Sequence, residues 1–418
     1  MDVYQPYLRG ERRDPSRIAV FLPGWAQEPS AADAIARLGA HDIQATEVDA
    51  GPGATWTIAG DWGRLSCLET DMDPEYLERF ADDLSDSERE AAKTAHVALE
   101  AEMELPEPLL ESYRDQLRLL HHVAPDAIAV HDRSSFRWQA RSWWIDALEV
   151  RTPPSPDNLF TIHAVSDEDG SVWLHTHGLG RGGSIELEVL GATREQAGGL
   201  GSLLRHAALL MLENGTPDPV TEFEVGHEME VCWRPWEEVV GERDADALGG
   251  RSDRDDPEHT GARGVLSMPG ERFRSVAELT PVLDDNPVFW VSNMETRRME
   301  MLAVERFPAF RELVQRFSGA DGWGFAAKIG YRIDPEEDGD IDDLPSEHLW
   351  FDVHGIDGVE IDATLLNEPY NIERMHAGDR GMHPVDQLSD WNVYSPWGSA
   401  GPDRVGLVFQ RLADEADS

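Results

Sequence analysis

The sequence predicts an α+β protein with more than one domain. A chain of 418 residues is longer than one folding unit usually is. Short apolar runs with strand periodicity alternate with segments of helical periodicity, and three strand-like runs follow one another in the middle of the chain. We therefore expect an N-terminal mixed α/β region, a central antiparallel sheet with helices, and a small β-rich C-terminal domain. A barrel-like arrangement is one option for that last domain.

The N-terminal mixed region covers residues 17–105. A helix is predicted at 29–38, with Ser30 as its N-cap. Asp73-Pro74 opens a longer helix through about residue 100, since proline in a first helical turn loses no hydrogen bond. Strands are predicted at 17–22, 42–48, 54–59 and 64–69.

The central part covers residues 106–240 and carries the strongest strand signal. Two connections join its three runs: an acidic turn at 166–171 and a glycine-rich loop at 178–184. The pattern predicts an antiparallel meander followed by a helix near 194–213. The three strands are expected at 159–165, 172–177 and 185–190.

Residues 241–264 contain many acids and few apolar side chains, which is typical of a flexible linker. We interpret this acidic segment as the main domain boundary, so that residues 1–240 form one α+β domain. A helical connecting segment is expected at 265–323, and the small β-rich domain at 324–418.

The charge balance excludes one class of partner. Lys and Arg number 36 against 81 Asp and Glu, a formal net charge of −45, which argues against binding a nucleic-acid backbone. The acids are scattered through every segment, and lysine occurs only as Lys93 and Lys328. At molar salt the Debye length falls to about 3 Å and such a chain no longer repels itself. The composition therefore indicates a halophilic host.

The apolar pattern indicates a cytoplasmic protein. No run approaches the roughly 18 apolar residues of a membrane helix, and the first residues lack the apolar core of a secretion signal. Cys67 and Cys232 lie far apart, so neither a disulfide framework nor a thiolate zinc site is expected.

Two sets of motifs carry a resemblance to known families. The runs EHLWF at 347–351, LLNEP at 365–369 and SDW at 389–391 are similar to the YegJ-like family of small bacterial domains of unknown function. The run WLHTHGL at 173–179, followed by Arg181 and ELE at 186–188, resembles a second uncharacterised bacterial family. The resemblance implies a two-part bacterial or archaeal cytoplasmic protein, and it implies no activity.

One polar constellation could carry chemistry. His175 and His177 share one face of a strand, and Glu186 and Glu188 share one face of the next. A symmetric hairpin would place His175 opposite Glu186 and bring the four side chains together. Such nitrogen and oxygen donors suit a divalent metal ion such as zinc, manganese or iron(II). A shift of one residue in the pairing register of the two strands would place the glutamates on the other face of the sheet.

One further residue completes the list of candidates. Arg181, within the glycine-rich loop, is a candidate ligand-binding residue in an anion-binding turn. Simple hairpin pairing puts His163 on the face opposite His175, so His163 is not counted with the cluster.

Two functions remain open at this point, of which the first is the preferred interpretation and the second the alternative. The first is non-catalytic binding of a protein partner, with the polar face of the sheet simply turned to solvent. The second is a metal-dependent hydrolase, in which His175 and His177 hold the metal ion and Glu186 or Glu188 acts as ligand or general base.

Overall fold

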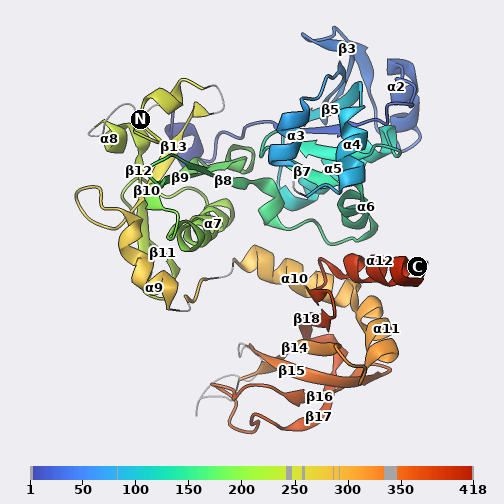
Figure 1. The fold of residues 1–418 in the computed structure, drawn as a ribbon, viewed down its shortest axis with the longest axis vertical. Helices are drawn as coiled ribbons and strands as arrows, with labels where there is room; N and C mark the ends of the chain where they lie inside the picture. Colours follow the sequence, from blue (N-terminus) through green and yellow to red (C-terminus); the bar gives the residue numbers. More distant parts are fainter. Residues whose placement is uncertain are drawn as a thin grey trace. The chain divides into compact units, whose positions relative to one another are not determined.

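The computed structural model describes residues 3–81, 83–241, 247–256, 259–285, 287–290, 292–333 and 346–416. It has three sheets with helices packed on them, which confirms the α+β class. The chain forms two compact units (Figure 1). Unit 1 contains residues 1–149 and 153–292, and unit 2 contains residues 150–152 and 293–418.

The first sheet of unit 1 has seven strands, in the order β2-β3-β4-β5-β1-β6-β7, and all of its pairs are antiparallel. Apolar side chains of β1 and of the helices that cover it form its core. The strands are β1 (Ser16–Phe21), β2 (Thr46–Val48), β3 (Ala54–Gly60), β4 (Gly63–Glu69), β5 (Val97–Met103), β6 (Ala129–Asp132) and β7 (Arg137–Ala140). The helices are α1 (Gln5–Leu8), α2 (Ala31–Gly39), α3 (Pro74–Phe80), α4 (Asp86–Lys93), α5 (Leu109–Val123) and α6 (Arg141–Glu149).

The long helix predicted from residue 73 to about residue 100 is wrong. The segment forms α3, α4 and the strand β5 instead. Ser85 starts a new helix, because its hydroxyl accepts the Glu88 N–H while the Glu88 carboxylate accepts the Ser85 N–H. Residues 97–103 then pair with both β1 and β4, so β5 lies inside the sheet.

The second sheet of unit 1 has six strands, in the order β11-β12-β13-β10-β9-β8. The predicted meander is confirmed, since β9 pairs antiparallel with both β8 and β10, whereas β10 and β13 are parallel. The strands are β8 (Thr161–Ser166), β9 (Ser171–His177), β10 (Glu186–Thr193), β11 (Phe223–Gly226), β12 (Met229–Pro235) and β13 (Arg263–Ser267). Three helices accompany them: α7 (Ala197–Asn214), α8 (Trp236–Val240) and α9 (Thr280–Asp284).

The acidic segment 241–264 is not the boundary between the units. Strand β13 begins at its end and lies between β12 and β10, so the chain returns to the central sheet. The boundary falls between Ser292 and Asn293 instead. Residues 242–246 and 257–258 of the predicted linker lie outside the described residues.

Unit 2 is an open six-stranded antiparallel sheet, in the order β17-β16-β15-β14-β18-β19. The barrel-like option is wrong, because β17 and β19 are the two edges and no closed barrel forms in the described part of the chain. Its strands are β14 (Gly324–Arg332), β15 (Ser346–Asp357), β16 (Glu360–Leu365), β17 (Arg380–Pro384), β18 (Leu388–Ser395) and β19 (Gly398–Ala400). Its helices are α10 (Asn293–Glu305), α11 (Phe307–Phe317) and α12 (Val405–Ala416).

Part of the predicted connecting segment belongs to the core of unit 2. Phe310 of α11 stacks on Trp391 of β18 with ring centroids 4.8 Å apart, and the Trp391 indole donates to the Ala303 carbonyl of α10. Both helices therefore pack on the sheet rather than connect two domains.

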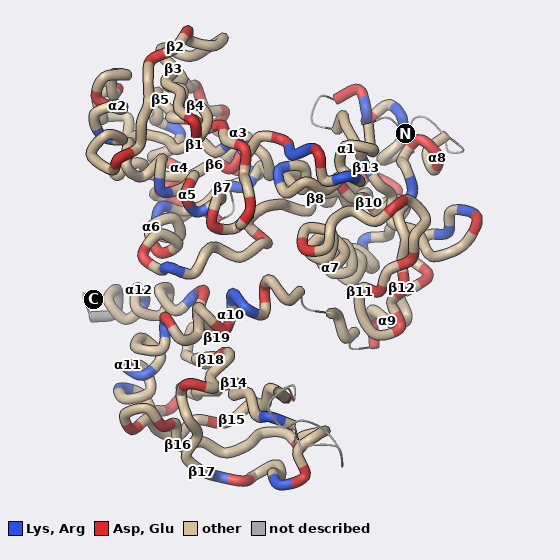
Figure 2. The backbone as a smooth tube through the Cα atoms, turned by 180° about the vertical axis from the view of Figure 1, so that it is seen from behind, with Lys and Arg blue, Asp and Glu red and all other residues tan. Residues whose placement is uncertain are grey.

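The acidic side chains have no single location. Figure 2 shows Asp and Glu on helices, strands and loops of both units. Among the residues that the structure describes, no helix has the length and hydropathy needed to cross a membrane.

Candidate metal centre

The hairpin of β8 and β9 brings three histidines together. His163 on β8 lies directly opposite His175 on β9, and Thr161 lies opposite His177. His175 and His177 are two residues apart on one strand, so their side chains share the face on which His163 also lies. The prediction that His163 lies on the opposite face is wrong.

The turn explains that error. The Asp167 N–H donates to the Ser171 carbonyl at 3.1 Å, which leaves a connection of three residues, 168–170. Gly170 ends this connection with a φ of 89°, the left-handed conformation that completes a three-residue hairpin loop. A hairpin loop with an odd number of residues pairs odd-numbered residues with odd-numbered ones. His163 therefore pairs with His175 and lies on the same face as the cluster.

The donor atoms of the three imidazoles lie within 4.8 Å of one another. His175 is 1% exposed and His177 is 4% exposed, while His163 is half-buried. Neither Nδ1 of His175 nor Nε2 of His177 has a hydrogen-bond partner. A buried polar nitrogen without a partner is costly, so two in one cluster require an explanation.

The electrostatic environment keeps these imidazoles neutral. Burial lowers the pKa of His175 and of His177 far below the usual value, and the positive charge of Arg263 lowers both further. Burial also lowers the pKa of His163. A neutral imidazole has the free lone pair that a metal ion binds, whereas an imidazolium has none.

The three side chains fit a divalent metal ion of the zinc type. Zinc binds histidine nitrogen at about 2.1 Å, so nitrogens around one ion lie roughly 3.4 Å apart in a tetrahedral arrangement. The three imidazole nitrogens, which lie within 4.8 Å of one another, would therefore have to move closer together on binding. Three histidines leave a fourth position open, which is the composition of a catalytic rather than a structural zinc site.

Aromatic side chains and a fourth histidine surround the cluster. The His259 ring centroid lies 4.9 Å from that of His175, and the Trp173 ring centroid lies 4.0 Å from that of His175 and 4.8 Å from that of His259. Phe136 contacts the His177 ring edge-on at 4.8 Å, although its backbone φ of 57° is unfavourable for a bulky residue. No pattern in the sequence marks His259, because it lies in the acidic segment interpreted as a linker.

Glu188 lies on the predicted face, but its carboxylate is bound by cations. The predicted pairing of His175 with Glu186 is wrong: His175 lies opposite Glu188, a shift of two residues that keeps the faces as expected. The Glu188 side chain is fully buried and accepts hydrogen bonds from Arg254, at 2.6 Å, and from the Trp173 indole, at 3.3 Å. Arg263 lies 3.5 Å away. Glu188 therefore binds Arg254, Trp173 and Arg263 beside the histidines, and its carboxylate is occupied by these partners.

Glu186 closes the glycine-rich loop. Its carboxylate accepts the Thr176 hydroxyl at 2.6 Å and the backbone N–H groups of Gly178, at 2.9 Å, and Gly180, at 3.3 Å. The loop thus binds an anion that the chain itself supplies. The structure brings His175 and His177 together with His163 and gives Glu186 other partners.

Arg181 is an internal residue of unit 1. Its guanidinium is 1% exposed and forms an ion pair with Asp132 at 2.8 Å. It also donates to the Leu159 carbonyl and to the Ser16 hydroxyl. These contacts give Arg181 a structural role in place of the predicted ligand-binding role.

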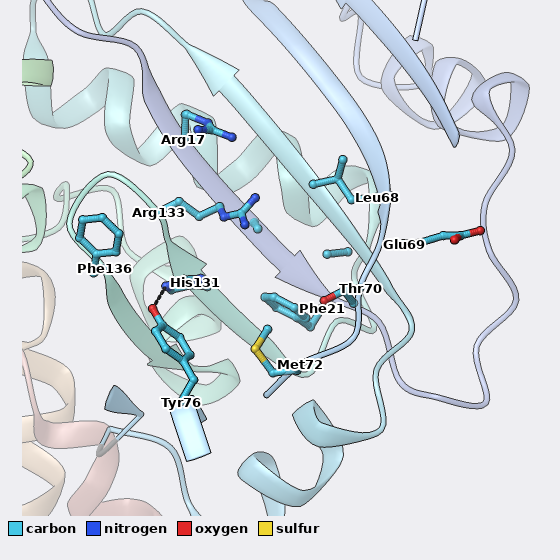
Figure 3. Close-up of a pocket in the computed structure, with 12 residues that line it drawn as sticks. Arg17, Phe21, Leu68, Glu69, Thr70, Met72, Tyr76, His131, Arg133 and Phe136 are labelled. Carbon is cyan, nitrogen blue, oxygen red and sulfur yellow. Dashed lines mark hydrogen bonds between the residues drawn. The ribbon is translucent and has the colours of Figure 1, made fainter. Parts of the chain in front are cut away.

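One cavity reaches the cluster, and a second lies next to it at Phe136 without being lined by any of its histidines. One, of about 320 Å³, is lined by His177 together with Ser134 and Arg263. The other, of about 520 Å³, lies on the seven-stranded sheet, where Tyr76 and His131 are hydrogen-bonded at 3.4 Å (Figure 3). Arg133 and Phe136 line both cavities. A small molecule in the first cavity would therefore reach the edge of the histidine cluster at His177.

Comparison with protein families finds three matching regions. Residues 64–154 match the N-terminal part, and residues 162–267 the C-terminal part, of a protein of unknown function, DUF4026. Residues 324–416 match DUF2314, described as an uncharacterised protein conserved in bacteria. No curated protein and no solved structure matches the chain. The resemblance to the YegJ-like family stays a prediction.

Proposed function

Because the chain joins the two DUF4026 regions to a DUF2314 region, all three described as uncharacterised, we propose its function from geometry. We propose that it binds a divalent metal ion of the zinc type through His163, His175 and His177, and that the bound metal serves a hydrolytic reaction. The observation that carries the proposal is the pair of buried, unpartnered nitrogens in a cluster of three imidazoles.

The surroundings support metal binding over a purely structural cluster. Three neutral imidazoles that only packed together would leave polar nitrogens buried without compensation. A metal ion removes that cost, since each nitrogen gains a bond. The lowered pKa values favour the same outcome, because protons compete weakly for these nitrogens.

The chemistry follows from the ligand set. A zinc ion with three histidine ligands lowers the pKa of a water in its open position to about 7 and so supplies a nucleophile at neutral pH. In this chain His177 connects the cluster to the cavity of about 320 Å³, where a substrate can approach. Phe136, packed on the His177 ring, limits access of bulk water from its side.

The first test measures bound metal. The full chain, purified in molar KCl and stripped with a chelator, is titrated with zinc chloride and analysed for retained metal. We expect one tightly bound ion per chain, and loss of that ion in a His175→Ala/His177→Ala double variant. His227→Ala, which removes an exposed histidine, is the matched control and should retain metal. Equal zinc retention in the double variant would refute the proposal.

The second test measures hydrolysis. We expect the zinc-loaded chain to hydrolyse an activated phosphodiester, bis(p-nitrophenyl) phosphate, with activity lost on chelation and restored by zinc. Activity that persists without metal would remove the hydrolytic part of the proposal.

The acidic composition supports a second, separate proposal about habitat. We propose that the chain works in a salt-rich cytoplasm, where its 81 acids bind water and cations rather than a partner. The spread of acids over both units in Figure 2 supports adaptation to the solvent rather than one binding face.

A further inference from the structure

Unit 2 contains a second cluster of reactive side chains, which the proposed metal centre does not involve. Ser389 on β18, His348 on β15 and Glu300 on α10 all line one cavity of about 900 Å³. These three residue types, in contact, form the usual apparatus of nucleophilic catalysis.

An irregularity in β18 directs Ser389 toward this cavity. Lys328 of β14 pairs with Asp390, and the next residue, Ile329, pairs with Leu388. Ser389 is therefore an extra residue in β18, a bulge, and its hydroxyl oxygen lies 3.1 Å from the Lys328 carbonyl oxygen and within reach of His348, so its single proton can turn to either acceptor. Bulges beside active sites commonly turn a side chain away from the regular pleat.

A glycine lets His348 reach across the strand between them. Strand β14 separates β15 from β18, and its Gly330 lies directly opposite His348. A Cβ at position 330 would lie 3.2 Å from Cε1 of His348, closer than ordinary van der Waals contact. Because Gly330 has no side chain, the imidazole lies over β14 and its Nδ1 comes within 2.7 Å of the Ser389 hydroxyl.

An acidic side chain lies on the other side of the imidazole. Nε2 of His348 is 4.0 Å from Oε1 of Glu300. This contact is longer than a hydrogen bond, as such contacts often are without substrate. Glu300 is 40% exposed and His348 is 32% exposed, so the imidazole edge and the carboxylate are both accessible from the cavity.

We propose that Ser389 is the nucleophile of a second active site that hydrolyses carboxylic esters, with His348 as its general base and Glu300 as the residue that orients His348. Ser389 and His348 belong to the SDW and EHLWF motifs of the C-terminal region. The hydrogen bond between their side chains joins these motifs in space.

The reaction balances with water as the second reactant. The Ser389 oxygen bonds to the ester carbonyl carbon while its proton moves to Nδ1 of His348. The bond from that carbon to the alcohol oxygen then breaks, and the alcohol leaves with the proton. Water next attacks the acyl group on Ser389 with the same base, releasing a carboxylic acid and restoring the serine.

The cavity fits an ester with an apolar part. Met301, Val304 and Leu388 supply apolar surface, and Gln387 carries amide N–H groups that can donate to a carbonyl oxygen. Burial lowers the pKa of His348, so its imidazole is neutral and able to accept a proton near neutral pH.

The test treats the full chain with a fluorophosphonate, a probe that bonds covalently to activated serines, and with p-nitrophenyl acetate. We expect the fluorophosphonate to add once, at Ser389 in peptide mapping, and the acetate to give a burst of p-nitrophenol. Ser389→Ala should abolish both. His348→Gln should slow ester hydrolysis by about 10² to 10⁴-fold. Glu300→Gln, a change on a half-exposed helical side chain, should slow it less.

The control is a second histidine–hydroxyl pair on the same sheet. His354 and Thr364 are hydrogen-bonded at 2.8 Å, so Thr364→Ala removes a comparable bond away from the cavity. It should leave labelling and hydrolysis unchanged. Absence of label at Ser389 in the folded chain would overturn the proposal. Labelling that survives in Ser389→Ala would also overturn it. The same holds if His348→Gln and Glu300→Gln both fold and both hydrolyse the ester at the unchanged rate.

Discussion

His163 lies directly opposite His175 across the β8–β9 hairpin, with ring centroids 5.6 Å apart. This single cross-strand pair changes a two-histidine motif on one strand into a three-histidine cluster. The register that makes the pair depends on the three-residue connection that ends at Gly170. The metal centre therefore depends on the conformation of a turn that contributes no ligand.

The turn can be tested directly. Gly170 has a φ of 89°, and a Cβ added there would meet no atom within 4 Å, so only the backbone conformation opposes a larger residue. Gly170→Val should lower the free energy of unfolding by about 1–2 kcal/mol and weaken zinc binding, because the preferred turn changes. Urea unfolding and zinc titration provide the measurements. Gly39→Ala, at the end of α2 in open space, is the control and should cause neither loss. Unchanged zinc affinity in Gly170→Val would show that the metal centre does not depend on the conformation of this turn.

The metal-free protein should lose stability in mild acid. Burial lowers the pKa of His131 to about 3 and lowers those of His175 and His177 well below the unfolded value, near 6.5. Below about pH 6.5 the unfolded chain therefore binds more protons than the folded chain, and the free energy of unfolding falls as pH falls. Above that pH these groups stay neutral in both states and the dependence on pH disappears.

The measurement is a series of urea unfolding curves between about pH 8 and 4, without metal. A His131→Gln variant should lose part of the slope below pH 6.5, while the exposed control His227→Ala should keep it. A midpoint independent of pH across this range would contradict the prediction. Bound zinc should oppose the acid effect, since the metal ion competes with protons for His175 and His177.

For Glu186 and Glu188, the sequence predicts the sheet face on which the side chain lies more reliably than the residues that the side chain binds. Glu186 and Glu188 were expected on the histidine face, and the observed shift of two residues in the β9–β10 pairing preserves that face. The partner of each glutamate could not be predicted, because Arg254 and Arg263 come from the acidic segment and the strand after it. Arg254 and Arg263, buried against Glu188, hold these two positions of the polar segment on the central sheet.

The sequence failed at loops and at long-range pairing for physical reasons. His163 was misplaced because the acidic turn was interpreted as an even connection, although the Gly170 left-handed conformation makes it odd. Strand β13 was missed because its pairing with β10 is parallel and crosses a long stretch of chain. In unit 2, the Ser389 bulge and the close approach of His348 to Gly330 are three-dimensional properties with no periodicity in the sequence.

Salt should stabilise the protein. With 81 acidic residues against 36 Lys and Arg, like-charge repulsion acts over a Debye length of about 10 Å at 0.1 M salt and about 3 Å at 1 M. The melting temperature should therefore rise steeply as KCl increases through this range. Differential scanning calorimetry measures the melting temperature at each KCl concentration. Guanidinium chloride cannot serve as the salt, because the guanidinium ion denatures proteins. A melting temperature that falls with KCl, or stays constant, would contradict the halophilic interpretation.

Removal of the Glu188 carboxylate should lower the free energy of unfolding strongly. This carboxylate is fully buried and bound to Arg254, which is 5% exposed, and Arg263, which is 1% exposed. Glu188→Ala leaves both guanidiniums buried with their main anion removed, and breaking a buried pair from one side typically costs about 3–5 kcal/mol. We expect a correspondingly large drop in the urea midpoint, with weakened zinc binding, since Trp173 loses its indole acceptor beside His175. Asp115→Ala, which breaks the exposed pair with Arg118, should change the midpoint little. Comparable small effects of the two substitutions would show that water, rather than Glu188, compensates Arg254 and Arg263.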